Sequence, residues 1–231
     1  MALYAIGDPH LSLGVAKPMD VFGGAWENYV EKLQQGFAKV RDEDTVVLCG
    51  DLSWGMSLEE ALPDFQFLDA LPGVKYIVKG NHDYWWNSAK KMTEFWAHHG
   101  LETLHLLHNN CAFYRDGVAL CGTRGWFFDE GLAQAEADKV YRRELMRLET
   151  SLKAAGEAPI KLAFLHYPPK YQGYACQEIL ELLERYGVSR CFYGHLHGPA
   201  HKLALQGPAN GVDYRMISAD YLDFAPEKIL D

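Results

Sequence analysis

The sequence predicts an α/β fold, in which helices and strands pack in layers around one core. The chain has 231 residues, of which 48% are hydrophobic, so a single domain spanning 1–231 can bury a sizeable core. In its first half, short β-branched runs alternate with longer amphipathic stretches. This alternation is typical of parallel strands that are joined by helical, right-handed crossovers.

The first half of the chain is expected to contain three strand–helix pairs. The buried strands are short apolar runs at 3–6, 45–49 and 74–78. Apolar residues recur at helical spacing in the three stretches 26–40, 58–71 and 88–99. Pro63 lies near the start of the second helix, and Ser88 and Gly100 are the expected N-cap and stop of the third.

The second half is expected to be richer in strands. Short strands are predicted at 102–107, 111–114 and 118–121, and Arg115-Asp116-Gly117 forms a hairpin-type turn between the last two. Two more amphipathic helices are predicted at 131–155 and 176–186. The remaining strands are predicted at 160–165, 189–193, 202–205 and 214–218.

Charge and cysteine content limit the partners of the chain. Lys and Arg number 22 against 31 Asp and Glu, which gives a formal net charge of −9. An acidic surface repels phosphate backbones, so no extended nucleic acid and no anionic membrane is expected as a partner. The five cysteines have no CxxC spacing, and the first residues do not resemble a signal peptide. We therefore expect reduced thiols and a cytoplasmic location, and the oligomeric state stays open.

Polar residues follow five of the predicted strands at the point where each strand ends. In chain order these sets contain Asp8 and His10; Asp51; Asn81, His82 and Asp83; His166; and His195 and His197. In open α/β sheets, ligands bind beyond the carboxyl ends of the strands. We therefore expect the five sets to converge on one site, although each residue taken singly would be read as an ordinary loop residue or a buried histidine.

The donor types indicate metal ions. Carboxylate, amide oxygen and imidazole without thiolate suit manganese, iron, zinc or cobalt. The set holds too many ligands for one tetrahedral ion, which predicts two ions with one shared carboxylate. We favour manganese or iron, with zinc, cobalt or nickel as alternatives.

Taken in order, the motifs Asp-x-His, Gly-Asp, Gly-Asn-His-Asp, a single His and Gly-His-x-His resemble the calcineurin-like metallophosphoesterase superfamily. The resemblance spans residues 8–197 and implies a four-layer αββα sandwich of two mixed sheets flanked by helices. It implies a first metal held by Asp8, His10, Asp51 and His197. It implies a second metal held by Asp51, Asn81, His166 and His195, so that Asp51 bridges the two.

The resemblance also implies an activity. A hydroxide that bridges two divalent ions attacks the phosphorus of a phosphomonoester or phosphodiester in line. His82 contacts the phosphate together with Asn81 and acts as the general acid, while Asp83 orients it or, alternatively, is only an acid near a helix N-terminus. Arg124 could clamp a phosphate or form a surface ion pair.

A small phosphorylated molecule, including a nucleotide, is the expected substrate. The segment after Gly50-Asp51 lacks the Asp-Arg-Gly of protein phosphatases, and the Asp-x-His-Leu and His-x-Pro-Pro strings are more similar to those of phosphodiesterases. Aromatic residues near the motifs could stack on a base or only pack: Trp54, Trp85, Trp86, Trp126, Phe127 and Phe128. The alternative function is a catalytically silent metal-binding scaffold of the same fold.

Overall fold

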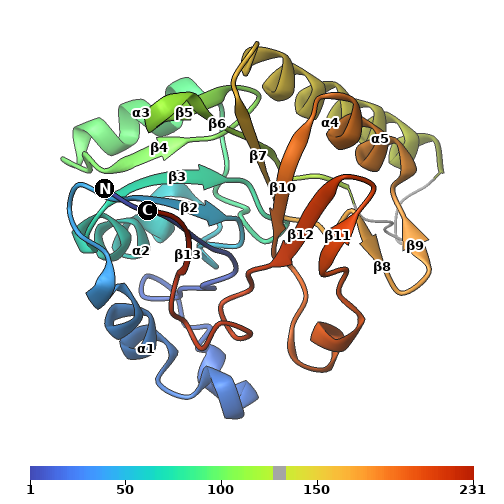
Figure 1. Ribbon diagram of the computed structural model, residues 1–231. Helices are drawn as coiled ribbons and strands as arrows, with labels where there is room; N and C mark the ends of the chain where they lie inside the picture. Colours follow the sequence, from blue (N-terminus) through green and yellow to red (C-terminus); the bar gives the residue numbers. More distant parts are fainter. Residues whose placement is uncertain (127–133) are drawn as a thin grey trace.

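Two sheets pack face to face, and each carries helices on its outer side (Figure 1). The computed structural model describes residues 1–126 and 134–231. Three helices cover the first sheet and two cover the second, so the layers run helix, sheet, sheet, helix. The predicted α/β sandwich of two mixed sheets flanked by helices is therefore confirmed.

The first sheet has five strands in the order β13-β1-β2-β3-β4. These are β13 (Glu227–Leu230), β1 (Leu3–Ile6), β2 (Thr45–Cys49), β3 (Val74–Val78) and β4 (Leu104–Leu106). The four strands β1 to β4 are parallel, because amphipathic helices return the chain between them, and β13 pairs antiparallel with β1. The carboxyl ends of β1, β2 and β3 therefore lie at one edge.

The second sheet has six strands in the order β11-β12-β10-β7-β6-β5. These are β11 (Gly207–Ala209), β12 (Val212–Met216), β10 (Val188–Tyr193), β7 (Ile160–Leu165), β6 (Val118–Thr123) and β5 (Cys111–Tyr114). The four central strands are parallel and the two outer pairs are antiparallel. A separate two-stranded hairpin joins β8 (Lys170–Tyr171) and β9 (Tyr174–Ala175).

The helices bury one apolar side each. The first sheet is covered by α1 (Tyr29–Gly36), α2 (Leu58–Ala70) and α3 (Ala89–His98), and the second by α4 (Gln134–Ala154) and α5 (Gln177–Arg185). The hydroxyl of Ser88 accepts a hydrogen bond from the Lys91 amide at 3.3 Å, and Gly100 follows α3 with φ of 70°, so the predicted cap and stop are confirmed.

The two sheets share a core. Val47 and Val78 of the first sheet belong to the same buried cluster as Phe164 and Phe192 of the second. The rings of Phe164 and Phe192 stack with their centroids 5.2 Å apart. Because this cluster joins the two sheets, the strand ends of one sheet keep a fixed position relative to the strand ends of the other.

Two sequence predictions about elements were wrong. The stretch 26–40 is not one helix: α1 is limited to Tyr29–Gly36, because Asn28 before it is left-handed with φ of 52° and a 3₁₀ turn follows it. The stretch 202–205 is not a strand, because the chain forms the 3₁₀ segment Gly198–Leu203, which has a proline as its second residue. The predicted start of the helix 131–155 lies outside the described residues.

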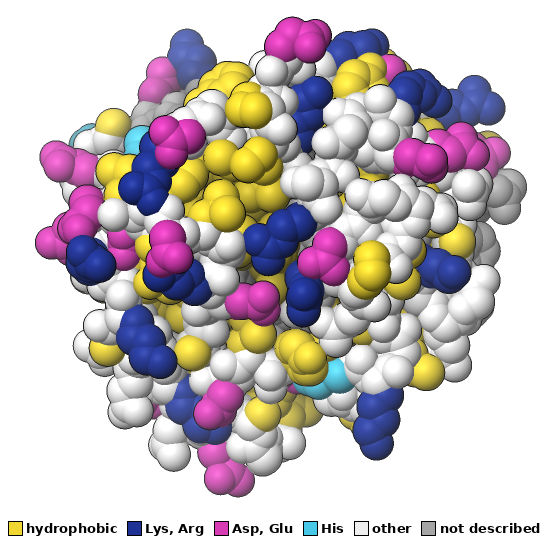
Figure 2. Space-filling model, viewed as in Figure 1, with side chains coloured by type: hydrophobic (Ala, Val, Ile, Leu, Met, Phe, Trp, Pro, Cys, Tyr) yellow, Lys and Arg dark blue, Asp and Glu magenta, His cyan; other side chains and the backbone are white. Residues whose placement is uncertain are grey.

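The surface carries mixed charge. Figure 2 shows that acidic and basic side chains are interspersed over the face seen in Figure 1. Such a surface offers no large basic field on that face for a phosphate backbone. Within the described part of the chain, every helix is too short or too polar to span a bilayer.

Candidate metal centre

The five polar sets of the sequence meet where strand ends of the two sheets face each other. Asp8 follows β1, and its amide donates a hydrogen bond to the Gly50 carbonyl at 3.0 Å, just after β2. The Gly194 amide, just after β10, donates to the His166 carbonyl at 3.1 Å, just after β7. These backbone hydrogen bonds tie neighbouring loops together and bring residues that are almost 190 positions apart within contact.

One group of side chains could hold a first metal ion. Ligand atoms of Asp8, His10 and His197 all lie within 4.8 Å of one another. The Nε2 atoms of His10 and His197 face each other at 3.3 Å. Two imidazole nitrogens at this distance share a proton at most, and a cation between them would satisfy both.

A second group lies beside the first. Ligand atoms of Asp51, His166 and His195 lie within 4.8 Å of one another. Oδ1 of Asn81 lies 2.6 Å from Nε2 of His166, so the amide oxygen joins the same group. Nδ1 of His166 lies 3.0 Å from the Cys49 carbonyl, an arrangement that leaves Nε2 free of a proton and able to bind a metal.

Asp51 lies between the two groups. Its Oδ2 is 3.7 Å from Nε2 of His10 in the first group and 3.5 Å from Nε2 of His166 in the second. Its Oδ1 accepts a hydrogen bond from the His82 amide at 2.7 Å, which fixes the carboxylate plane. The structure therefore places Asp51 where a bridging ligand would stand.

Two glycines permit the close approach of these loops. A Cβ at Gly80 would lie 2.1 Å from Oδ1 of Asp51, and a Cβ at Gly194 would lie 2.2 Å from Oδ2 of Asp8. Any side chain at either position would displace a carboxylate of the site. The glycines before Asn81 and His195 are therefore required by the close packing of the loops at these strand ends.

The electrostatics of the site favour bound cations. The carboxylates of Asp8 and Asp51 are almost inaccessible to water, and this burial raises their pKa values. The positive charge that surrounds the two carboxylates is therefore too small to offset the cost of burying them. Burial lowers the pKa of His166 to about 3 and also lowers those of His10 and His195. Neutral imidazoles and buried carboxylates are the forms that bind divalent ions, and Oδ1 of Asp8 is buried without a hydrogen-bond partner in the described parts of the chain, 1–126 and 134–231. The residues present therefore fit a pair of divalent metal ions.

His82 lies at the exposed side of this cluster. Its ring centroid is 5.8 Å from that of His10 and 4.5 Å from that of Trp54. The hydroxyl of Tyr84 lies 3.3 Å from Nδ1 of His82. Burial lowers the pKa of His82. The ring therefore lies next to the ligand groups and near solvent, and its role as a proton donor stays a prediction.

Asp83 has another set of partners. Its carboxylate accepts hydrogen bonds from the amides of Gly80 at 2.7 Å, Leu52 at 2.8 Å and Asp51 at 3.0 Å, and from the Trp85 indole at 3.1 Å. These bonds fasten the loop after β2 to the loop after β3. The orienting role toward His82 stays a prediction, and the contacts favour Tyr84 for that role.

Arg124 lies behind the second group. Its carbonyl accepts hydrogen bonds from the amides of His166 and Tyr167, at 3.1 and 2.9 Å. Its guanidinium is 3.6 Å from the buried carboxylate of Glu144. An ion pair is therefore present, and a contact of the same side chain with a substrate phosphate remains a prediction.

Asp220 was missed in the sequence analysis. Its Oδ1 accepts a hydrogen bond from Nδ1 of His197 at 2.9 Å, and its Oδ2 accepts one from the Gly198 amide at 3.0 Å. It follows β12, which is parallel to β10, and so belongs to a sixth polar set at a strand end. The rule that selected the other five sets would have found it.

Two hollows near the site differ in character. A cavity of about 460 Å³ borders His197 and Asp220 and has otherwise mainly apolar walls, which include Met19, Phe22, Trp26 and Pro199. Trp54 stacks on His10, with ring centroids 5.0 Å apart, and thus lines the metal cluster, whereas Trp85 is fully buried against Phe65. Phe127 and Phe128 lie outside the described residues.

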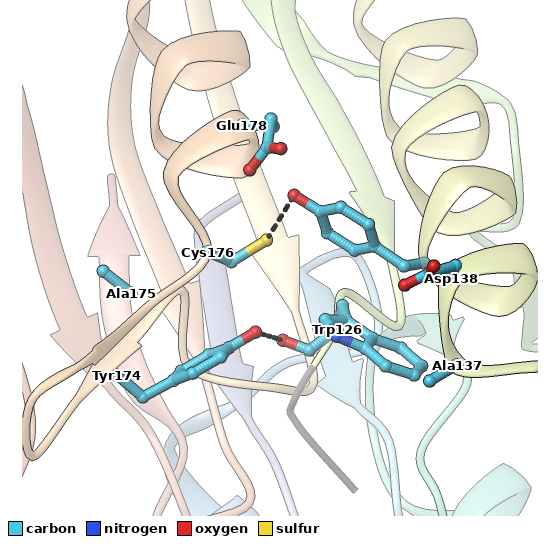
Figure 3. A pocket seen from close by; sticks show the side chains of 8 residues that line it. Trp126, Ala137, Asp138, Tyr174, Ala175, Cys176 and Glu178 are labelled. Atoms are coloured by element: carbon cyan, nitrogen blue, oxygen red, sulfur yellow. Dashed lines mark hydrogen bonds between the residues drawn. The ribbon is translucent and has the colours of Figure 1, made fainter. Parts of the chain in front are cut away.

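The second hollow holds a cysteine whose neutral thiol form is favoured. Figure 3 shows Cys176, Tyr174, Trp126 and Glu178 around a cavity. The cavity has a volume of about 240 Å³, and the Cys176 thiol lies 3.6 Å from the Tyr141 hydroxyl. Burial raises the pKa of the Cys176 thiol, so the nucleophilic thiolate is disfavoured. None of the predicted metal ligands lines this cavity.

The family of the chain follows from its sequence as well as from this geometry. The sequence profile of the calcineurin-like phosphoesterases matches residues 1–199. The chain belongs to the calcineurin-like phosphoesterase family. The resemblance inferred from the motifs is therefore confirmed, and no curated protein matches the chain in sequence.

Two solved structures have the same fold as this chain. A phosphopantetheinyl hydrolase from Mycobacterium tuberculosis has 14% sequence identity and a TM-score of 0.63, with 99% of this chain and 95% of that chain covered. A protein of unknown function from Aquifex aeolicus has 14% identity and a TM-score of 0.51, with 98% and 95% covered. At these identities the similarity supports the fold alone.

Proposed function

We propose that the protein is a phosphoesterase with two divalent metal ions that hydrolyses a small phosphomonoester or phosphodiester. The observation that carries this proposal is the place of Asp51, whose Oδ2 lies 3.5 and 3.7 Å from a histidine nitrogen of each ligand group. One carboxylate shared by two ligand groups is the arrangement that a two-metal hydrolytic site requires.

Each ligand group would hold one ion. Asp8, His10, Asp51 and His197 would hold the first ion, and Asp51, Asn81, His166 and His195 the second. Manganese or iron is the proposed metal, because the donor set is made of oxygen and imidazole nitrogen. When bound, such ions supply an activated water and neutralise charge on the phosphoryl oxygens.

His82 would supply the proton for the leaving group. It lies beside the metal cluster, its backbone amide is fixed on Asp51, and its ring contacts Trp54 and Tyr84. General acid catalysis by a positioned histidine contributes about 10²–10⁴-fold. The Asp83 carboxylate would support this step indirectly, since it holds the loop that carries His82.

The substrate is proposed to be small. The cavity of about 460 Å³ next to His197 has the size of a small-molecule site, and its mainly apolar lining suits the uncharged part of an ester or a nucleobase. The net charge of −9 disfavours a long polyanion.

The proposal is tested with metal-stripped protein to which Mn²⁺ is returned, using p-nitrophenyl phosphate and bis-p-nitrophenyl phosphate. We expect turnover only with metal, and a loss of at least about 100-fold in Asp51→Asn, because the shared ligand is weakened. Asp69→Asn is the matched control: Asp69 lies on α2 and accepts hydrogen bonds from Thr103, at the amino ends of β3 and β4, whereas the ligands follow carboxyl ends of strands.

The result also separates the enzyme from the scaffold alternative. A chain that binds Mn²⁺ but hydrolyses neither ester, whether Asp51 is intact or replaced, would contradict the proposal and favour a catalytically silent metal-binding module.

A further inference from the structure

A second charged cluster lies beside the metal centre and takes no part in metal binding. Lys79 comes directly after β3, Arg124 directly after β6, and Arg147 lies on α4. A single buried acid, Glu144, lies among them with its side chain 1% exposed. Three elements that are distant in sequence, β3, β6 and α4, thus contribute three cations and the Glu144 carboxylate to one place.

The packing of the two sheets brings these residues together. A Cβ at Gly122 of β6 would lie 3.2 Å from the Val78 side chain of β3, so the ends of these two strands are in contact. Lys79 and Arg124 are the next charged residues beyond that contact. The ammonium of Lys79 lies 6.0 Å from the ring centroid of Trp86, and Trp86 in turn lies 5.4 Å from His108.

Glu144 fixes the two arginines. Its Oε1 is 2.6 Å from Arg147 and 3.6 Å from Arg124, and its Oε2 accepts a hydrogen bond from the Thr123 hydroxyl at 3.0 Å. The carboxylate is therefore fully used, and the arginines cannot move away from it without breaking these contacts. Their forks are preorganised for a further anion.

The cluster has excess positive charge. The three cations face two carboxylates, since Glu144 pairs with both arginines and Asp83 attracts Lys79. The buried Nε of Arg124 has no hydrogen-bond partner among the described residues. Burial lowers the pKa of His108, and the neighbouring charges of Arg147 and Lys79 lower it further. A further anion would offset the repulsion among these cations. Repulsion between like charges is stronger at partly buried positions than in bulk water.

The cluster borders the second ligand group. The Arg124 carbonyl accepts the amide hydrogen of His166, and Lys79 is two residues before Asn81. The side chains of Arg124 and Arg147 are 21% and 29% exposed, so both can meet a molecule from solvent. A ligand bound at the metal centre could therefore extend to them.

We propose that Lys79, Arg124 and Arg147 form an anion subsite that binds a second phosphate group of the substrate. The inference rests on the proposed function and narrows its substrate class to phosphoesters that carry another phosphate. Paired arginines recognise phosphate oxygens in two-point contacts, and lysine adds a compact charge. Lys79 and Arg124 each lie near an aromatic ring, with the Arg124 guanidinium 5.7 Å from the Tyr167 centroid and the Lys79 ammonium 6.0 Å from that of Trp86.

The experiment measures binding of inorganic pyrophosphate to metal-stripped protein by calorimetry, in the presence of a chelator. Without metal, only the protein's own cations can hold the anion. We expect binding by the parent chain and about tenfold weaker binding in each of Lys79→Gln and Arg147→Gln. Arg147→Lys keeps the charge and is expected to retain more affinity than Arg147→Gln, and it controls for a folding defect.

Lys153→Gln is the matched control, because Lys153 lies on the same helix, is 63% exposed and pairs with Glu149. Absence of pyrophosphate binding in the parent, or equal binding in the parent and both glutamine variants, would overturn the subsite. If the parent chain binds pyrophosphate without metal but hydrolyses neither ester when Mn²⁺ is returned, the proposed function is overturned and the subsite is not.

Discussion

Several residues of the metal centre have a backbone conformation that costs free energy. Asp8, His10, Asp51 and His195 have φ values of 57°, 46°, 51° and 71°, in the left-handed region that non-glycine residues seldom adopt. Each such residue costs on the order of 1–3 kcal/mol and persists where the surrounding structure enforces it. Four of the eight residues predicted as metal ligands or as the general acid have this conformation. This proportion indicates that ligand position has been favoured over local stability.

At this scale, His82 offers a test of the proton-transfer step. His82→Gln is expected to lower kcat about 10²–10⁴-fold for phenyl phosphate and much less for p-nitrophenyl phosphate, because p-nitrophenolate leaves without a proton. The measurement is kcat for both esters with saturating Mn²⁺. Equal losses for the two esters would show that His82 is not the general acid, and Tyr84→Phe, which only removes a hydrogen bond to His82, is expected to cost far less.

Asp220 is the second residue with a distinct expected effect. Because its carboxylate accepts the Nδ1 hydrogen of His197, Asp220→Asn is expected to weaken the first metal site by about 10–100-fold. Competition with a fluorescent chelator measures the Mn²⁺ affinity. Asp223→Asn, with a side chain that is 85% exposed, is the control and should keep the parental affinity.

At the scale of elements, the site is made by strand ends rather than by helices. Parallel strands of both sheets finish at the same edge, and short loops there hold the ligands because the backbone of one loop bonds the next. The amides of His10 and Asp8 donate to the carbonyls of Asp51 and Gly50, both at 3.0 Å. The loops are thus a continuation of the sheet, which gives them the rigidity that a preorganised site needs.

The close approach of loops can be tested with glycine substitutions. Gly80→Ala and Gly194→Ala are expected to weaken Mn²⁺ binding strongly, because the added methyl would meet Asp51 or Asp8 at little more than 2 Å. Gly7→Ala is the matched control, since its Cβ would find only ordinary contacts from 3.4 Å upward. Parental affinity in both Gly80 and Gly194 variants would show that these loops can separate without losing the site.

At the scale of the whole molecule, we propose that residues 1–231 form one domain, because strands of both sheets share a buried cluster. Such a domain cannot lose one sheet without exposing the inner face of the other. The buried ionisable groups at the joint between the sheets then influence the stability of the entire chain.

The pH dependence of metal-free protein follows from those groups. Buried acids with raised pKa values, Asp8 at about 8 and Asp83 at about 7, bind protons more tightly when folded, so their contribution is lost as pH rises through these values. The lowered histidine pKa values act in the opposite direction, but only below the ordinary histidine pKa of about 6.5. Between about pH 6.5 and 8 the acids therefore dominate.

We accordingly expect the Tm of metal-stripped protein to fall as pH rises from about 6.5 to 8, and the fall to shrink when Mn²⁺ replaces the protons. Circular dichroism melts at several pH values, with and without the ion, measure both effects. A Tm that rises over this range without metal would contradict the burial argument.

The sequence predicted much of the architecture and the members of the ligand set. Strands such as Thr45–Cys49 and Ile160–Leu165 were found at their true bounds, because buried parallel strands are uninterrupted apolar runs. The strand Glu227–Leu230 was missed, because it is a short edge strand whose first two residues are charged and leave only two apolar residues as a signal.

Longer-range features were harder to predict. The cluster of Lys79, Arg124, Glu144 and Arg147 depends on how β3, β6 and α4 pack, which spacing along the chain does not reveal. Asp83 and Tyr84 are neighbours in sequence but have different partners, since Asp83 bonds backbone amides and Tyr84 contacts His82. The turn of the chain at these residues decides which partner each side chain reaches. Local pattern names the residues, and tertiary packing decides which of them touch.

The last strand has a practical meaning for anyone who shortens this polypeptide. The family match ends at residue 199, yet β12, β13 and Asp220 all come later. A fragment trimmed to the matched region would leave β1 and β10 each with an unpaired side, and His197 without the carboxylate on its ring nitrogen. A fragment with boundaries drawn from sequence similarity would therefore aggregate through its exposed strand edges and bind metal weakly, and it would not be a smaller enzyme.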